Sequence, residues 1–152
     1  MRKISVLMLI LIAGVLFAQD DLLEILRSDL KTQKVAIITD AMEFTEQESG
    51  VFWPLYKEYD FELTKLNDAR IATVKDFANN YDTMTDVKAE ELIKQSLKFQ
   101  KDRVSLREKY FKKFKKILPV MKAAKFMQVE NQLTNFIDAQ LSAEIPLIEM
   151  PE

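Results

Sequence analysis

The sequence predicts an all-α protein, an elongated helical hairpin with about four helices. Its 152 residues include only two glycines, Gly14 and Gly50, and sheets joined by tight hairpins need more turn residues than that. Long stretches rich in Lys, Glu, Leu and Ala instead carry apolar residues at helical spacing. Two of these stretches have about 33 residues, or roughly 50 Å of helix. Elements of that length pair as a hairpin rather than as a compact globule.

Residues 1–18, MRKISVLMLILIAGVLFA, have the composition of a secretory signal peptide. The apolar run is shorter than the roughly 20 residues of a spanning helix, so we expect cleavage after Ala18. An uncleaved anchor is the alternative. The chain has no cysteine for a disulfide or a lipid anchor. We therefore expect a soluble periplasmic protein in which residues 19–152 form a single helical domain.

The first two helices are expected over residues 22–42 and from Thr45 onward. Thr45 and Glu48 have the spacing of a capping box, in which each side chain accepts the backbone N–H of the other residue. The second helix should reach a turn at residues 79–85. Its predicted core stripe follows steps of three, four and seven and consists of Phe52, Leu55, Tyr59, Leu66, Thr73 and Phe77.

Gly50 and Pro54 interrupt the pattern of the second helix near its start. Proline lacks a backbone N–H, and its ring presses on the carbonyl four residues earlier, which belongs to Gly50. The pair predicts a static kink that wraps the first turns of the helix around the core. A moving hinge is the alternative.

The third helix should begin after Thr85, whose side chain can cap it, and end near Leu118. Pro119 fits the first turn of a fourth helix, and Pro146 begins a short non-helical tail. The apolar face of the fourth helix is expected to comprise Ala123, Phe126, Met127, Leu133, Phe136, Ile137 and Leu141.

An antiparallel second and third helix joined near Asp82 should pair residues whose numbers sum to about 165. This register brings together Leu55 and Tyr110, Tyr59 and Leu106, and Leu66 and Phe99. It also predicts ion pairs of Glu58 with Arg107, Glu62 with Arg103, and Lys75 with Glu90.

The composition argues against an enzyme, a cofactor or a metal site. The chain has no histidine and no cysteine, so it lacks the usual general base, the usual sulfur nucleophile and the usual soft metal ligands. Its acidic residues fall on helix faces that look solvated, and no pair of them is set around a pocket. We therefore predict a binding protein without cofactor.

Residues 94–125 carry 12 Lys or Arg and only two acidic residues, whereas residues 40–93 carry 13 acidic and 5 basic residues. Export and this balance argue against a nucleic-acid partner. The basic segment instead predicts a docking surface for acidic clients or partners, with Phe111 and Phe114 adding apolar contact. The expected contact residues are Arg107, Lys109, Tyr110, Lys112, Lys113, Lys115 and Lys116. A merely solvated face and a membrane-surface helix are the alternatives.

FTEQE at Phe44–Glu48 resembles the Leu-Thr-x-x-Gln motif of the Spy/CpxP family of periplasmic stress proteins, with Thr45 matching and Glu48 in place of glutamine. LPVMK at Leu118–Lys122 is a weaker second copy. The segment FWPLYKEY is similar to FWPxYxxY of an uncharacterised Spy-like branch. This resemblance implies a four-helix hairpin with ATP-independent chaperone or envelope-stress functions. Members of that branch are also described as periplasmic metal sensors or as sensors linked to sigma factors.

Our hypothesis from the sequence is a chaperone-like or stress-response protein that binds unfolded clients through its basic helical face. The alternative is a regulatory module that uses the same face to bind one membrane sensor or anti-sigma partner. A homodimer is compatible with either function.

Overall fold

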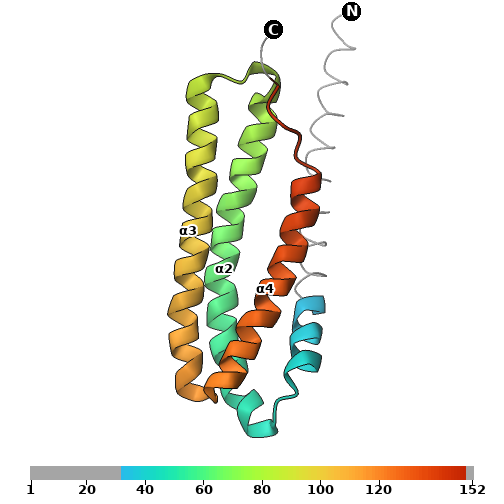
Figure 1. The fold of residues 1–152 in the computed structure, drawn as a ribbon, viewed down its shortest axis with the longest axis vertical. Helices are drawn as coiled ribbons and strands as arrows, with labels where there is room; N and C mark the ends of the chain where they lie inside the picture. The colour runs from blue at the N-terminus through green and yellow to red at the C-terminus, as the bar shows by residue number, and fades with distance from the viewer. Residues whose placement is uncertain (1–31, 150–152) are drawn as a thin grey trace, which may run out of the picture. The chain divides into compact units, whose positions relative to one another are not determined.

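The computed structural model describes residues 32–149, and it confirms the all-α fold (Figure 1). Within these residues the chain forms helices and turns and no strand. Helical residues 32–42 are followed by α2 (Glu46–Asn80), the 3-10 helix η1 (Tyr81–Thr83), α3 (Asp86–Ile117) and α4 (Val120–Ala143). The expected signal peptide and the first part of the expected first helix lie outside the described residues.

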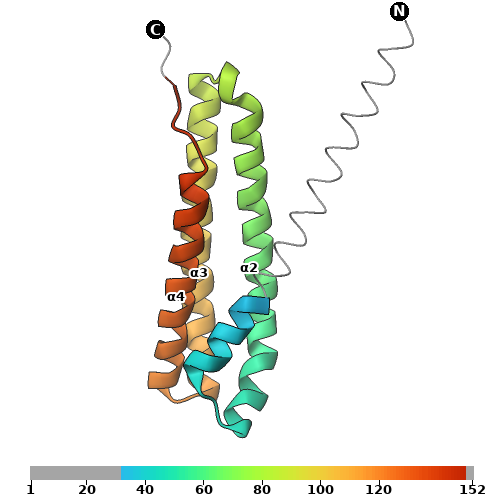
Figure 2. The same cartoon turned by 90° about the vertical axis from the view of Figure 1, so that its right-hand side faces the viewer.

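The chain divides into two compact units, residues 1–41 and residues 42–152. The second unit contains the hairpin, in which α2 and α3 lie side by side and antiparallel, with α4 returning along them (Figures 1 and 2). The predicted single domain from residue 19 stays a prediction.

The predicted capping box opens α2. The Thr45 hydroxyl accepts the backbone N–H of Glu48 at 3.2 Å, and the Glu48 carboxylate accepts the backbone N–H of Thr45 at 2.9 Å. Just before it, Glu43 has a φ of 47°, in the left-handed region. The chain therefore leaves the helical conformation at Glu43 and enters α2 through a fully formed cap.

Helix α2 is continuous through Gly50 and Pro54. Both residues are exposed, and a side chain at position 50 would meet no atom of another element within 4 Å. Tertiary packing therefore does not require a glycine there. The predicted bend, static or hinged, stays a prediction.

The boundaries of α3 and α4 agree closely with the sequence. The Thr85 hydroxyl accepts the backbone N–H of Lys88 at 3.2 Å at the start of α3, and Leu118 is its C-cap. Pro119 is the N-cap of α4 rather than a residue of its first turn. The non-helical tail that follows α4 reaches η1, because Tyr81 donates its hydroxyl to the carbonyl of Leu147 at 3.0 Å.

The largest buried side chains of the hairpin form an aromatic cluster at the end where α3 turns into α4. Rings from all three helices pack edge to face or tilted, and Phe52 stacks on Tyr56, at centroid distances of 4.8 to 6.4 Å. Burial of these rings removes a large apolar area from water and stabilises the contact of α4 with the hairpin. The cluster consists of Phe52, Tyr56 and Tyr59 of α2, Tyr110 and Phe114 of α3, and Phe126 of α4.

The predicted core faces are partly wrong. In α2, Tyr56 and Leu63 are buried, whereas Leu55 and Leu66 are only half-buried. In α4 the prediction fails near the C-terminus, because Phe136 is 62% exposed and Leu141 is 44% exposed. Tyr56 is buried because its ring also meets Phe126 of α4, at a centroid distance of 6.0 Å, and the prediction considered only α3 as a neighbour of α2.

The predicted register holds near the turn, where Asp76 pairs with Lys88 at 2.7 Å. It also holds at the other end of the hairpin, where the ring centroids of Phe52 and Phe114 lie 5.3 Å apart. The ion pairs predicted between these two points are wrong. Glu62 pairs with Lys109 instead of Arg103, and Glu58 pairs with Lys113 instead of Arg107. Each partner lies six residues farther along α3 than predicted.

The two arginines instead face α4. Arg103 pairs with Asp138 at 2.8 Å, and Arg107 donates to Asn131 at 3.1 Å. Similarly, Glu90 pairs with Lys94 on its own helix. We predicted the ion pairs from α2 and α3 alone. In the structure, residues of α4 bind the two arginines for which we had expected partners on α2.

Candidate binding surface

The basic segment of α3 divides into three faces. Arg107 points towards α4, where its guanidinium bonds to Asn131. Lys109 and Lys113 reach the carboxylates of Glu62 and Glu58 on α2, at 2.7 Å and 3.1 Å. The remaining predicted contact residues, Lys112, Lys115 and Lys116, are exposed to solvent and make no ion pair with the residues that the structure describes.

Tyr110 belongs to the core rather than to the surface. Its side chain is fully buried, and its hydroxyl donates to Glu62 at 2.8 Å. Burial, followed by the bond to Glu62, raises the pKa of Tyr110 above its ordinary value. Phe114 is also fully buried, whereas Phe111 is half-buried under the ammonium of Lys115 at 4.9 Å. The apolar contact expected from Tyr110 and Phe114 is therefore already used within the fold.

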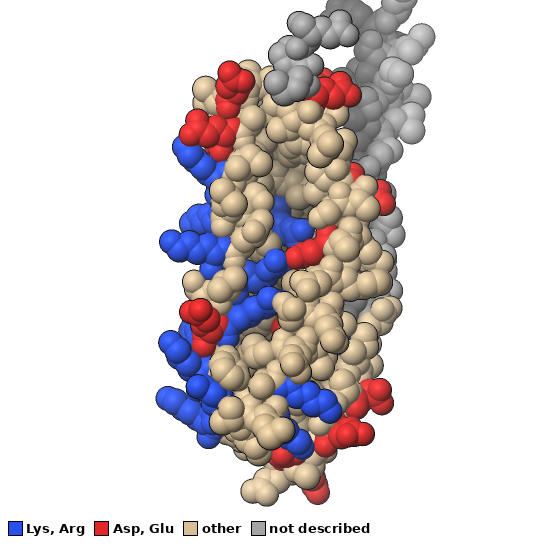
Figure 3. Space-filling model, viewed as in Figure 1, with Lys and Arg blue, Asp and Glu red and all other residues tan. Residues whose placement is uncertain are grey.

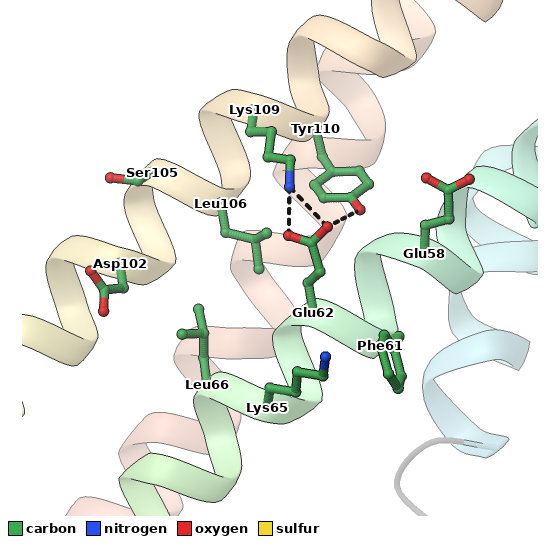
Figure 4. A pocket seen from close by; sticks show the side chains of 10 residues that line it. All are labelled: Glu58, Phe61, Glu62, Lys65, Leu66, Asp102, Ser105, Leu106, Lys109 and Tyr110. Atoms are coloured by element: carbon green, nitrogen blue, oxygen red, sulfur yellow. Dashed lines mark hydrogen bonds and ion pairs between the residues drawn. The ribbon is translucent and has the colours of Figure 1, made fainter.

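An open groove of about 690 Å³ lies between α2 and α3 beside this segment (Figure 4). Leu66 and Leu106 point towards one another across it, and Glu62 reaches over to Lys109 and Tyr110. Phe61 stands at its edge with 62% of its surface exposed. The groove thus combines an apolar floor with charges of both signs.

Exposed lysines continue the α3 side of this groove. Lys112 follows Ser105, which lines the groove, by seven residues, and Lys116 follows Lys109 by seven. Lys101 precedes Ser105 by four. Residues at these separations lie on the same side of a helix. We call Lys101, Lys112 and Lys116 the lysine edge of the groove. All three are exposed and make no ion pair with the described part of the chain.

The two copies of the helix-entry motif meet in the structure. Glu48 of the first copy forms an ion pair with Lys122 of the second copy, and the Lys122 ammonium lies 5.7 Å from the ring centre of Phe44. The hydrogen bond from Lys122, followed by that from the Thr45 backbone, lowers the pKa of Glu48 below its ordinary value. Phe44, Thr45 and Glu48 therefore fasten the start of α2 to the start of α4. Both copies are visible in the sequence, whereas their contact is visible only in the folded chain.

A carboxylate that no sequence pattern indicated is buried beside the aromatic cluster. Glu130 of α4 is fully buried and accepts the Tyr59 hydroxyl at 3.0 Å. Burial, with the nearby Glu130 charge, raises the pKa of Tyr59 above its ordinary value. A lone glutamate in an amphipathic helix looks like a surface residue in the sequence. The burial of Glu130 becomes visible only in the folded chain, where the Tyr59 hydroxyl donates to its carboxylate.

A second polar contact joins all three helices. Asp138 of α4 accepts from Arg70 of α2 at 2.5 Å and pairs with Arg103 of α3 at 2.8 Å. Burial on its own would raise the pKa of Asp138, but the two arginines outweigh it and lower that pKa below its ordinary value. Figure 3 shows basic atoms and an acidic group together in the seam between α3 and α4.

Between residues 32 and 149, no group of three or more acidic, histidine or cysteine residues could hold a metal ion. Over the same residues, no helix has the length and apolar content needed to cross a membrane. The sequence matches no model of a known protein family and no curated protein, and no solved structure matches the fold. The surface features therefore carry the functional argument.

Proposed function

We propose that this chain is an exported, ATP-independent chaperone-like or envelope-stress protein that binds unfolded polypeptide segments. The observation that carries the proposal is the groove between α2 and α3 together with its lysine edge. The resemblance of FTEQE to the Spy/CpxP motif supports the same function. No catalytic step is part of the proposal.

The groove and the lysine edge suit the two stages of client capture. Unfolded chains expose acidic and apolar segments together. Exposed, unpaired lysines attract the acidic segments over long distances, which raises the rate of encounter. Leu66, Leu106 and the exposed ring of Phe61 can then contact apolar side chains within the open groove. An open groove does not enclose the client, so release needs no nucleotide.

The test reverses two lysines of this edge. Lys112→Glu with Lys116→Glu should slow the capture of an unfolded client at least about threefold at low salt and remove most of its salt dependence. Lys115→Glu with Lys125→Glu is the matched control, because it changes the net charge equally through two exposed lysines that make no ion pair with the described residues and do not line the groove. Suppression of client aggregation, measured by light scattering at low and high salt, provides the readout.

Equal protection by the two double variants at both salt concentrations would refute the role of the lysine edge. Phe61→Ser tests the apolar stage separately, and it should weaken retention of the client without changing its salt dependence. Binding of one protein from an envelope extract, with no protection of unrelated unfolded clients, would instead favour the regulatory module.

A further inference from the structure

Helix α4 is held to the hairpin by two different kinds of contact. Near its start, Ala123 and Phe126 are fully buried, and the Phe126 ring lies 4.8 Å from Phe114 and 5.0 Å from Phe52. After Glu130, no residue of α4 is buried. The distal half of α4, residues 131–143, is therefore attached to the hairpin by half-buried Leu133 and Ile137 together with polar contacts.

The strongest of these contacts places a carboxylate between two arginines. Asp138 meets Arg70 at 2.5 Å and Arg103 at 2.8 Å. Both guanidinium groups also lie near the Phe99 ring, at 5.3 Å and 4.9 Å from its centre. Arginine recognises carboxylates through paired N–H donors and stacks on aromatic rings. Arg70, Arg103 and Phe99 thus form a carboxylate receptor that a residue of the same chain already occupies.

Arg107 extends this receptor by one helical turn. Its guanidinium bonds to Asn131 through one nitrogen. Its Nε and second terminal nitrogen are buried without a hydrogen-bond acceptor in the described part of the chain. Buried donors without acceptors are costly, and a second carboxylate near Arg107 would satisfy them. Tyr59, which donates to buried Glu130, also lies close to this guanidinium. The seam therefore holds more arginine donors than Asp138 alone uses.

We propose that the distal half of α4 is a latch, and that acidic segments of polypeptide clients compete with Asp138 for Arg70 and Arg103. This inference rests on the proposed function and adds a second site, in the seam between α3 and α4. When the latch opens, Phe126 keeps the start of α4 anchored while Phe99 and the arginines are uncovered. Asp138 returns to water, where its charge is hydrated.

A competing internal ligand lowers the apparent affinity for an external one, because only the open fraction binds. Asp138→Asn should weaken the latch while it leaves both arginines in place. We expect this variant to bind a fluorescent peptide of alternating Glu and Leu at least about fivefold more tightly than the unmodified protein. The same peptide with Gln in place of Glu should bind Asp138→Asn and the unmodified protein with equal affinity. Fluorescence anisotropy measures both affinities.

Two further variants separate competition from simple loosening of the fold. Arg103→Gln also breaks the contact with Asp138, but it removes part of the receptor, so it should weaken binding of the Glu peptide. Glu90→Gln is the matched control, because it removes one carboxylate from an exposed pair with Lys94. Its affinity for the peptide should equal that of the unmodified protein.

Hydrogen exchange supplies an independent readout. Residues 131–143 should exchange faster in Asp138→Asn, and the Glu peptide should accelerate their exchange in the unmodified protein. The proposal is overturned if Asp138→Asn binds the Glu peptide no more tightly than Glu90→Gln does. It is also overturned if the peptide leaves exchange in residues 131–143 unchanged. Client protection could still depend on salt and on the lysine edge while Asp138→Asn leaves it unchanged. That result would refute the latch but not the proposed function.

Discussion

Phe126→Ala tests whether the aromatic cluster is what attaches α4 to the hairpin. Phe126 is fully buried and is the only residue of α4 in the cluster. Its ring lies 4.8 Å from Phe114, 5.0 Å from Phe52, 6.0 Å from Tyr56 and 6.2 Å from Tyr59. Truncation therefore removes one ring from contact with four others and leaves a cavity between three helices.

The expected loss is about 3–5 kcal/mol in the free energy of unfolding, the usual range for a buried phenylalanine changed to alanine. Four ring contacts favour the upper end, because each aromatic pair contributes about 0.5–1.5 kcal/mol beyond its buried area. Domains are commonly stable by only about 5–15 kcal/mol. The variant should thus lose a large part of its stability, with a melting temperature lower by roughly 10–20 °C.

Phe136→Ala is the matched control. It makes the same change in the same helix at a residue that is 62% exposed, so differences in helix propensity cancel, and it should cost less than about 1 kcal/mol. Urea unfolding followed by circular dichroism measures both variants. A loss below about 1.5 kcal/mol for Phe126→Ala, or equal losses for both variants, would refute the assignment of the cluster as the main attachment of α4.

Four further predictions concern the backbone and pH. Gly50→Ala should raise the free energy of unfolding by about 0.5–1 kcal/mol, since the site is helical and open. Glu43→Gly should raise the free energy of unfolding by up to about 1 kcal/mol, because it relieves the left-handed φ of 47°. A lower urea midpoint would contradict either prediction. Pro54→Ala should increase helicity by circular dichroism and leave client binding nearly unchanged, and a loss of binding with intact folding would indicate a hinge instead. The pKa of Asp138 is lowered in the folded state, so its ionised form contributes fully to stability above the unfolded pKa, and this contribution is lost as pH falls below about 4. If Asp138→Asn loses as much stability in acid as the unmodified protein, Asp138 makes no such contribution.

The ends of the helices could be predicted because their signals are local. The caps at Thr45 and Thr85 depend on a side chain and a backbone N–H three residues away, and both are within reach of sequence pattern. The turn at residues 79–85 and the end of α3 before Pro119 follow from residue types alone. These predictions needed no knowledge of which helices are neighbours, and they agree with the structure.

The pairing of α2 with α3 could not be predicted equally well, because it depends on a third helix. Considered alone, the hairpin offers Arg103 and Arg107 to the acids of α2. In the structure, α4 supplies Asp138 and Asn131 to these arginines, and lysines six residues farther along meet Glu62 and Glu58. Charge pattern identifies compatible partners, but it does not rank them when several lie within reach of one another.

The basic segment shows the same limit in the candidate site. Twelve basic residues over residues 94–125 look like one continuous surface in the sequence. In the folded chain, Lys109, Lys113 and Lys122 are neutralised by acids of α2, and Arg103 is neutralised by an acid of α4. What remains for a partner is the lysine edge beside the groove, exposed Lys115 and Lys125, and the buried donors of Arg107. Net charge in the sequence therefore overstates the docking surface, and the proposed client must be recognised by a few unpaired cations and exposed apolar groups rather than by a uniform positive field.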